Sequence, residues 1–153
     1  MAKKFDIRDR LGYRVQNLAN KMALWGSRTY NREFNVGAQE WRVLSFLMRQ
    51  SKGTAREICE FTLMDKGNVS RTVRRLIEDG CVKEQQDAED KRSTLLIPTK
   101  VGVDLYRRIK KTSDKREKRF MDALTAAERK ALPLILTKLN LVMDDLLQDL
   151  ERR

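Results

Sequence analysis

Apolar residues in the first part of the chain recur at steps of three and four. The series comprises Ile7, Leu11, Val15, Leu18, Met22 and Trp25. Because an α-helix places such positions on one face, the pattern predicts a long helix over residues 6–33 with one apolar stripe. A second helix is predicted over residues 38–49, with four positions facing inward: Trp41, Leu44, Leu47 and Met48.

Capping residues mark the start of two further helices. Thr54 and Glu57 have the spacing of a capping box, in which each side chain bonds the other residue's backbone N–H, and the short helix they open ends near Phe61. Asp65 is placed to cap the next helix, which Gly80 ends. Its apolar positions are Val69, Val73, Leu76 and Ile77, and its opposite face carries Lys66, Asn68, Ser70, Arg71, Arg74 and Arg75.

The rest of the chain is expected to form a β-hairpin and two long helices. Strands are predicted at residues 81–86 and 94–98, joined by a polar loop at residues 87–92, and a helix is predicted over residues 99–124. Thr125 and Glu128 form a second capping box, which opens a last helix over residues 125–150 with a wide apolar face. The predicted fold class is therefore mainly α with a small β-hairpin, in a single domain of residues 1–153.

Composition excludes several classes of function. Lys and Arg number 33 against 22 Asp and Glu, and this net charge of +11 favours a polyanionic partner such as nucleic acid or an anionic membrane surface. The absence of histidine removes the commonest general base and the commonest zinc ligand together. Since no GxxxxGK[ST] or GxGxxG phosphate loop is present either, we predict no enzymatic activity, no metal site and no cofactor.

Membrane insertion is also disfavoured. The longest apolar stretches, such as residues 132–136, fall far short of the roughly 20 residues of a spanning helix. The basic residues 1–10 precede an amphipathic pattern instead of the apolar core of a secretory signal. Two cysteines, Cys59 and Cys81, are too few and too far apart for a disulfide scaffold. We therefore expect a cytoplasmic protein.

The two short helices at residues 54–61 and 66–78, joined by a tight turn, have the pattern of a helix-turn-helix. In that motif the second helix enters the major groove of double-stranded DNA, and side chains of its N-terminal half reach the base edges. Those positions are occupied here by Lys66, Asn68, Ser70 and Arg71. Arg74 and Arg75 lie a turn further on and are predicted to contact phosphate. On composition alone, the alternative is an ordinary solvated face, but the hairpin that follows at once favours a winged helix-turn-helix.

These segments resemble the MarR family of bacterial transcriptional regulators over nearly the whole chain. Residues 65–71 (DKGNVSR), with Leu76 and residues 80–82, resemble the family's recognition helix and the strand after it. Asp90, Lys91, Arg92 and Ser93 resemble the family's wing signature D-x-R-S. Thr99 and Gly102 resemble the T-x-x-G that follows it in the family. The resemblance implies a DNA-binding lobe over residues 37–100. It also implies that the basic tip with Lys91 and Arg92 contacts DNA, with Arg92 in the minor groove and its guanidinium held by Asp90.

Some wing positions depart from the family pattern. Glu84, Gln85 and Gln86 stand where many members carry arginine, and Pro98 replaces a common leucine. We therefore expect the wing either to contribute less phosphate affinity or to sit at a different angle.

The resemblance further implies a homodimer that forms through the end helices, residues 6–33 and 125–150, with residues 99–124 as a long connecting helix. Two apolar end helices flank a lobe too small to cover both, which independently favours a second copy, although an intramolecular pair of helices is the alternative. A two-fold dimer presents two recognition helices about 34 Å apart and predicts a pseudo-palindromic operator.

Family members commonly respond to small phenolic or aromatic carboxylate effectors, and the resemblance implies such a ligand here. Candidate residues for its site are Tyr13, Trp25, Tyr30, Trp41 and Arg42, although aromatic residues at helical spacing also form plain core. A thiol switch at Cys59, with Arg56 one turn away, is a second possibility, but a buried structural cysteine is the favoured interpretation.

The function predicted from the sequence is a sequence-specific DNA-binding repressor, released from its operator by a small aromatic ligand. A different class of protein competes with it: a basic adaptor that binds RNA or a membrane surface through eight Lys and Arg residues between Arg107 and Arg119. We favour a solvated helix face for that segment.

Overall fold

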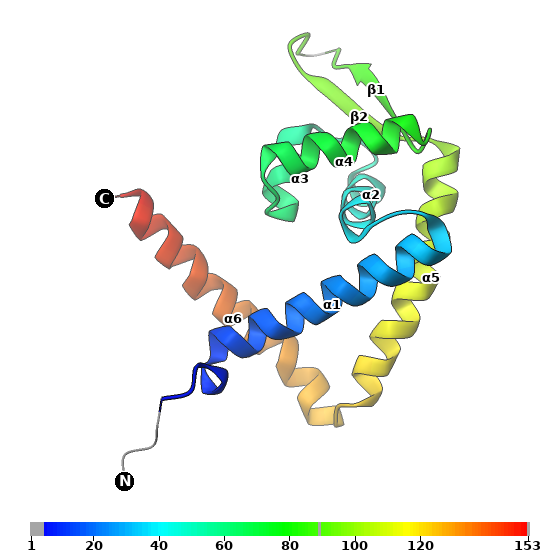
Figure 1. Ribbon diagram of the computed structural model, residues 1–153. Coiled ribbons are helices and arrows are strands. Elements are labelled where there is room, and N and C mark those ends of the chain that lie inside the picture. The colour runs from blue at the N-terminus through cyan, green and yellow to red at the C-terminus, as the bar shows by residue number, and fades with distance from the viewer. Residues whose placement is uncertain (1–4, 89, 153) are drawn as a thin grey trace. The chain divides into compact units, whose positions relative to one another are not determined.

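The computed structural model describes residues 5–88 and 90–152 and consists of helices and one hairpin (Figure 1). The elements are a 3-10 helix at Ile7–Asp9, α1 at Leu11–Phe34, α2 at Ala38–Gln50, α3 at Ala55–Thr62, α4 at Lys66–Glu78, β1 at Val82–Gln86, β2 at Thr94–Pro98, α5 at Lys100–Asp122 and α6 at Ala126–Glu151. The predicted fold class and the predicted order of elements are confirmed. The described residues fall into two compact units that divide between Lys110 and Lys111, within α5. The predicted domain boundaries stay predictions.

The predicted first helix is interrupted near its start. Asp6 accepts the backbone N–H of Arg8 at 2.9 Å and so caps the short 3-10 helix. Arg10 then has an extended backbone, with φ −80° and ψ 139°, and α1 begins only after it. The local hydrogen bond of Asp6 therefore competes with the helical periodicity that the apolar stripe indicates.

The predicted N-caps are confirmed. Thr54 accepts the N–H of Glu57 at 3.2 Å, and the Glu57 carboxylate accepts the N–H of Thr54 at 2.7 Å, which completes the capping box of α3. Asp65 accepts the N–H of Asn68 at 2.8 Å at the start of α4. The box of Thr125 and Glu128 opens α6 in the same way. Each cap satisfies N–H groups that a helix leaves without an internal partner, so it fixes where the helix starts.

The C-terminal end of α4 is a Schellman motif. The N–H of Gly80 bonds Ile77 O at 2.9 Å, and the N–H of Cys81 bonds Leu76 O at 2.8 Å. Gly80 has a φ of 66°, the left-handed conformation that glycine adopts without a Cβ clash. The chain thereby turns directly from α4 into β1.

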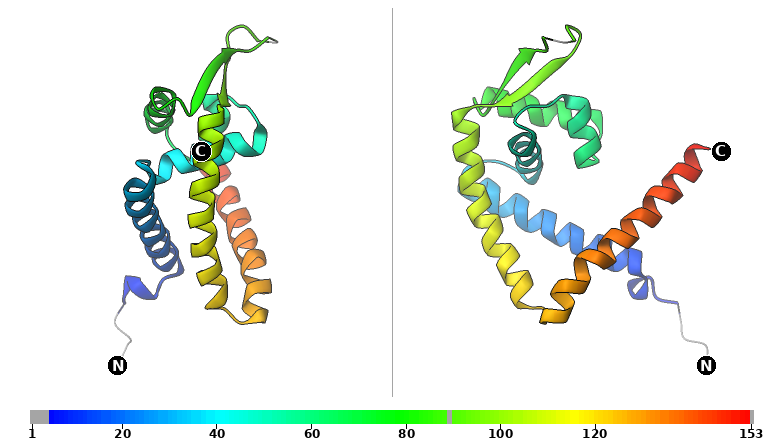
Figure 2. Two further views of the ribbon diagram at one scale, coloured as in Figure 1. Left: turned by 90° about the vertical axis from the view of Figure 1, so that its right-hand side faces the viewer. Right: turned by 180° about the vertical axis from the view of Figure 1, so that it is seen from behind.

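One apolar core holds α2, α3, α4 and the hairpin together. Its fully buried members include Val43, Leu44, Leu47, Ile58, Val69, Leu76 and Leu96. α4 places its apolar face against this core, so its polar face is left on the outside. Figure 2 shows the hairpin extending past α4 in both views.

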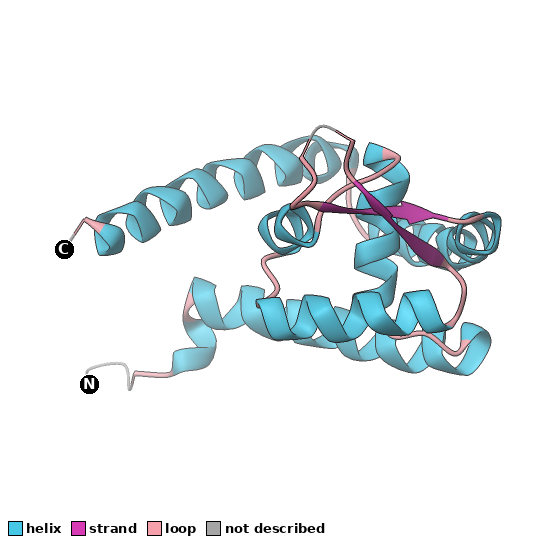
Figure 3. Cartoon of the chain, turned by 90° about the horizontal axis from the view of Figure 1, so that it is seen from above, coloured by secondary structure: helices cyan, strands magenta, loops and turns pink. Residues whose placement is uncertain are grey.

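The wing is joined to the segment that precedes α3. β1 and β2 pair antiparallel, with Val82 opposite Pro98 and Gln86 opposite Thr94 (Figure 3). Gly53 pairs with Leu96 on the other side of β2, through N–H···O bonds of 3.1 and 2.8 Å. This extra pairing fixes the base of the hairpin against the start of α3.

The T-x-x-G segment joins the wing to α5. Thr99 donates its hydroxyl to Gly80 O at 2.6 Å and accepts the N–H of Gly102 at 3.2 Å. A Cβ on residue 102 would lie 2.1 Å from the carbonyl oxygen of Cys81, so α5 can approach this backbone only with glycine there. The segment therefore holds the start of α5 against the end of α4.

Both end helices carry exposed apolar side chains. Ile7 in the 3-10 helix is about half exposed, and so are Leu11, Val15 and Leu18 in the N-terminal third of α1. α6 has no buried residue among those described, and its exposed apolar side chains include Leu132, Ile135, Val142, Met143, Leu146, Leu147 and Leu150. Over residues 5–88 and 90–152, no helix is both long enough and apolar enough to cross a membrane.

Candidate nucleic-acid interface

The polar face of α4 is the largest gathering of the predicted site residues. Lys66, Ser70, Arg71 and Arg74 are exposed, and Asn68 is partly buried near the helix start. The apolar residues Val69, Val73 and Leu76 of the same helix are buried. The helix therefore presents basic and amide side chains outward from a fixed support.

At the N-terminus of α4, the capping residue Asp65 and two of these side chains, Asn68 and Arg71, form a chain of hydrogen bonds. The Asp65 carboxylate accepts both the backbone N–H and the side-chain amide of Asn68. The amide oxygen of Asn68 then accepts a bond from the Arg71 guanidinium at 2.5 Å. The pKa of Asp65 is lowered, mainly by the backbone N–H of Asn68. The ionised helix cap thus orients Asn68, and Asn68 in turn orients Arg71.

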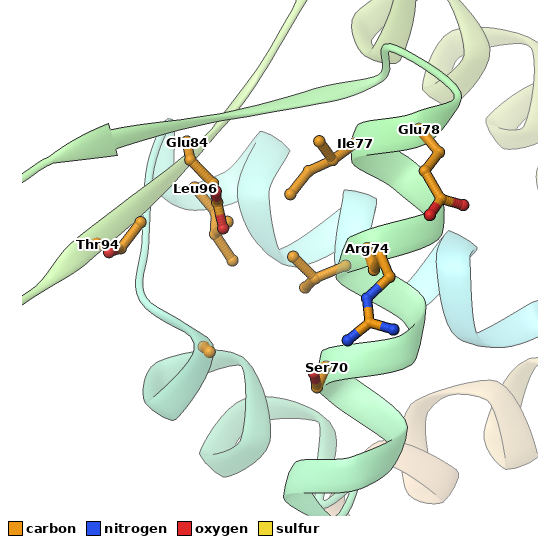
Figure 4. A pocket seen from close by; sticks show the side chains of 9 residues that line it. Ser70, Arg74, Ile77, Glu78, Glu84, Thr94 and Leu96 are labelled. Atoms are coloured by element: carbon orange, nitrogen blue, oxygen red, sulfur yellow. The ribbon is translucent and has the colours of Figure 1, made fainter.

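A groove separates α4 from the hairpin and has a volume of about 420 Å³ (Figure 4). From α4 it is lined by Ser70, Arg74 and Ile77, and from the strands by Glu84, Thr94 and Leu96. Arg74 therefore shares this groove with the carboxylate of Glu84. A basic and an acidic side chain face the same opening between the two predicted DNA-contacting elements.

Arg75 differs from the other predicted contacts because its guanidinium is bound within the protein. Nη1 lies 3.4 Å from Oε1 of Glu40 on α2, and Nη2 donates to the backbone oxygen of Asn35 at 2.8 Å. Its Nε lies 3.9 Å from the Asp79 carboxylate. Arg75 was predicted to contact phosphate together with Arg74, because neither Glu40 nor Asn35 is near it in sequence.

The wing tip exposes both Lys91 and Arg92. Asp90 accepts the backbone N–H of Arg92 at 3.0 Å, and Asp90 O accepts the N–H of Ser93 at 2.8 Å. The expected bond between Asp90 and the Arg92 guanidinium is not found among the described residues. An aspartate at a turn reaches the N–H two residues ahead more readily than a long side chain, so Asp90 shapes the loop backbone.

The structure brings three of the predicted ligand-site residues together. Ring centroids lie 5.8 Å apart for Trp25 and Tyr30, and 6.1 Å apart for Tyr30 and Trp41. Tyr106 of α5 stacks on Trp41 at 5.0 Å. Tyr106 was not among the predicted ligand-site residues, because it lies 65 residues after Trp41 and only the packing of α5 brings the two rings together. Tyr30 is 1% exposed, and its hydroxyl has no hydrogen-bond partner within the described residues.

The other two predicted ligand-site residues are not part of this aromatic cluster. Tyr13 lies more than three turns before Trp25 on α1, is exposed, and makes no ring contact with the cluster in the described part of the chain. Arg42 donates its guanidinium to the backbone oxygen of Thr62 at the end of α3. The Arg42 guanidinium therefore joins α2 to the end of α3.

The thiols favour a structural interpretation. Cys81 is buried, and burial, with a smaller contribution from the Asp79 charge, raises the pKa of its thiol. Cys59 is partly buried and packs against the core, while Arg56 bonds Glu60 at 2.9 Å. A raised thiol pKa lowers the thiolate fraction at neutral pH, so Cys81 is poorly reactive.

Comparison with known proteins agrees with this arrangement. A MarR family sequence model matches residues 34–93. The crystal structure of a MarR/EmrR family transcriptional regulator from Acinetobacter sp. ADP1 is 31% identical, covers 92% of this chain and 99% of its own, and has a TM-score of 0.85. The chain belongs to the MarR family. The predicted resemblance to the MarR family is therefore confirmed.

Other known proteins extend the comparison. The transcriptional activatory protein BadR of Rhodopseudomonas palustris is 28% identical over 106 residues, which are 67% of this chain and 60% of BadR. This chain thus spans less than two thirds of that curated relative. Two solved structures share the fold at lower identity. A mutant E. coli MarR complexed with operator DNA has 22% identity, covers 88% of this chain and 99% of its own, and has a TM-score of 0.78. BpsR of Bordetella bronchiseptica, whose DNA binding is regulated by 6-hydroxynicotinic acid, has 19% identity, covers 90% and 98%, and has a TM-score of 0.79.

Proposed function

We propose that this MarR family protein is a transcriptional regulator that binds double-stranded DNA by placing α4 in the major groove. The observation that carries the proposal is the arrangement of α4. Its N-terminus is capped, its apolar face is buried, and its outer face presents Lys66, Ser70 and Arg71 beside an exposed basic wing tip. The net charge of +11 supports a polyanionic partner.

Each exposed side chain has a role that fits its chemistry. Arg71 can bond guanine bidentately, and Asn68 can pair with adenine. Ser70, Lys66 and Arg74 supply contacts to phosphate, which fix the register of the helix on the duplex. Lys91 and Arg92 approach the adjacent minor groove from the wing tip. Asn68 and Arg71 are already bonded to each other, so the same donor and acceptor atoms are held near the helix start before DNA arrives.

Repression by a ligand-sensitive homodimer is the finer part of this proposal. A second copy would cover the exposed apolar faces of α1 and α6, and the dimer would occupy a pseudo-palindromic operator. A small aromatic acid or phenol would bind beside Trp25, Tyr30 and Trp41 and release the DNA. The regulation of BpsR by 6-hydroxynicotinic acid supports an aromatic effector, and the unpartnered Tyr30 hydroxyl supplies a polar group for it.

The central test is selection of bound duplexes from a random DNA pool, followed by titration of the selected duplex with Arg71→Ala and Arg92→Ala. We expect Arg71→Ala to lose about 1–3 kcal/mol of discrimination at one base position. Arg92→Ala should weaken binding of the same duplex. Arg107→Ala on α5 is the matched control, because Arg107 is exposed but pairs with Asp104 outside the interface.

The competing adaptor would give a different result. If the selection enriched no sequence, and Arg71→Ala and Arg107→Ala lowered affinity equally for all duplexes, the proposed function would be wrong. Under the proposal, log K for the selected duplex also falls steeply with log salt, because phosphate contacts release counterions. Screening aromatic acids for release of the selected duplex then tests the effector.

A further inference from the structure

We propose that Arg75 is a positioning residue that attaches α4, the proposed recognition helix, to the junction of α1 and α2. The position and orientation of α4 then depend on the C-terminal end of α1. The inference rests on the proposed DNA-binding role of α4. It assigns to Arg75 a role different from phosphate contact.

The Arg75 guanidinium is committed to groups of the protein. It donates to Asn35 O at 2.8 Å and lies 3.4 Å from the Glu40 carboxylate. Its side chain is 43% exposed, and the exposed fraction of the Glu40 side chain is 9%. A cation that already faces a carboxylate and a carbonyl has fewer N–H groups directed at DNA. Arg74, the preceding residue, instead lines the open groove beside the wing.

Glu40 depends on this partner. Its Oε2 accepts the backbone N–H of Gly37 at 2.9 Å, which caps the start of α2, and its Oε1 faces Arg75. Asp79 is a second carboxylate near Arg75, 3.9 Å from its Nε. Loss of Arg75 would leave the nearly buried Glu40 carboxylate without its cationic partner, so we expect the α2 cap to be destabilised as well.

Asn35 connects the same arginine to α1. This residue follows the last turn of α1 and adopts a left-handed backbone conformation with a φ of 57°. Helix ends leave carbonyl oxygens without internal partners, and Arg75 satisfies this one. Five residues earlier on α1 lies Tyr30, which contacts Trp25 and Trp41. A displacement of the end of α1 at the aromatic cluster would therefore move the anchor of α4.

A second, neutral contact joins the same elements one turn earlier on α4. The buried Thr72 donates its hydroxyl to the Gln39 side chain of α2 at 3.4 Å. Together the two contacts attach the inner face of α4 to the start of α2. Of Thr72 and Arg75, only Arg75 also bonds the residue that follows α1, through the backbone oxygen of Asn35.

Salt dependence separates positioning from phosphate contact. Each phosphate contact contributes about 0.9 to the slope of log K against log salt, whereas a residue that only orients the helix leaves that slope unchanged. We would measure the affinity of the full chain for its selected duplex over a range of salt, for Arg75→Gln, Glu40→Gln and both together. Arg74→Gln is the matched control.

Arg75→Gln and Glu40→Gln should each weaken binding by roughly 2- to 30-fold with an unchanged slope, and the double variant should be no weaker than the worse single variant. Arg74→Gln should make the fall of log K with log salt less steep, by about 0.9 in the slope. The inference would be overturned if Arg75→Gln lowered the slope as Arg74→Gln does while Glu40→Gln tightened binding, as expected when Arg75 holds phosphate.

Hydrogen exchange without DNA provides a readout that does not depend on the proposed function. Arg75→Gln and Glu40→Gln should speed exchange both at residues 35–37 and in α4, while Arg74→Gln leaves both segments unchanged. Unchanged exchange in the first two variants would overturn the inference even if DNA binding were established. If wild-type protein selected no duplex but the exchange result held, the proposed function would fail and the link between α1 and α4 would stand.

Discussion

The three arginines of α4 have different neighbours, and the roles proposed for them differ for that reason and not because of their own chemistry. Arg71 is held by Asn68, which the Asp65 cap orients. Arg74 lines the groove beside the wing. Arg75 is bound to Glu40 and Asn35 inside the lobe. The same guanidinium can thus read a base, neutralise phosphate or position a helix, according to the acceptors within its reach.

Glu84 provides a test at the level of a single residue. It is an exposed carboxylate in the groove that also contains Arg74 and Ser70, where phosphate would approach. We expect Glu84→Gln to tighten DNA binding about two- to fivefold at low salt, because it removes from the groove a charge of the same sign as phosphate. The gain should shrink as salt rises.

Fluorescence anisotropy with the selected duplex measures this effect. Asp104→Asn on α5 is the control, since it removes one negative charge outside the groove. Weaker binding by Glu84→Gln would instead indicate that the carboxylate accepts a bond from DNA or supports the wing.

At the level of elements, the position of α4 depends on the segments before and after it. The capping box of Thr54 sets the start of α3, and Gly53 next to it pairs with β2. The Schellman motif at Gly80 sets the start of β1. The short helix, the recognition helix and the wing therefore form one hydrogen-bonded assembly, in which the angle between α4 and the hairpin is fixed.

Removal of the α3 cap should weaken this assembly. Thr54→Ala removes the hydroxyl that accepts the N–H of Glu57, and we expect the free energy of unfolding to fall by about 1 kcal/mol. Thr54→Ser keeps the hydroxyl and should retain most of the stability. Urea denaturation followed by circular dichroism measures the difference. Equal stability of the alanine and serine variants would show that the hydroxyl does not stabilise the fold.

At the level of the whole molecule, the exposed apolar faces of α1 and α6 indicate that another protein surface covers them. Each helix is long and amphipathic, and the apolar side chains of both are about half exposed in a single chain. Exposed apolar surface on this scale is characteristic of an interface between proteins. The proposed homodimer would bury these faces and set the spacing of two recognition helices.

Self-association can be tested through α6. Leu146→Glu places a charge on the apolar face and should weaken dimerisation at least about tenfold, because it removes apolar burial and adds a charge to desolvate. Gln148→Glu adds the same charge on the opposite side of α6 and should leave dimerisation unchanged. Sedimentation velocity over a range of concentrations measures the dimer dissociation constant of each variant. A dimer that persisted in Leu146→Glu would place the interface elsewhere.

The sequence by itself determined most of the local structure of this protein, apart from the break at Arg10 before α1. Thr54, Asp65 and Thr125 were identified as N-caps because a cap needs only a side chain and an N–H within three residues. The apolar spacing of Val69, Val73 and Leu76 likewise predicted the buried face of α4, and so the face left outward. The helix-turn-helix order and the hairpin followed from these short-range signals.

Only the tertiary structure decided which outward residues are available to a ligand. Arg75 meets a carbonyl 40 residues away in sequence, and Gly53 pairs with Leu96 across α3, α4 and β1. No periodicity carries such information, because these contacts depend on how the elements pack and not on their internal spacing. Tyr106 joins the aromatic cluster for the same reason. Local hydrogen bonding and apolar periodicity thus fix the elements, while packing assigns each charged or aromatic side chain its partner.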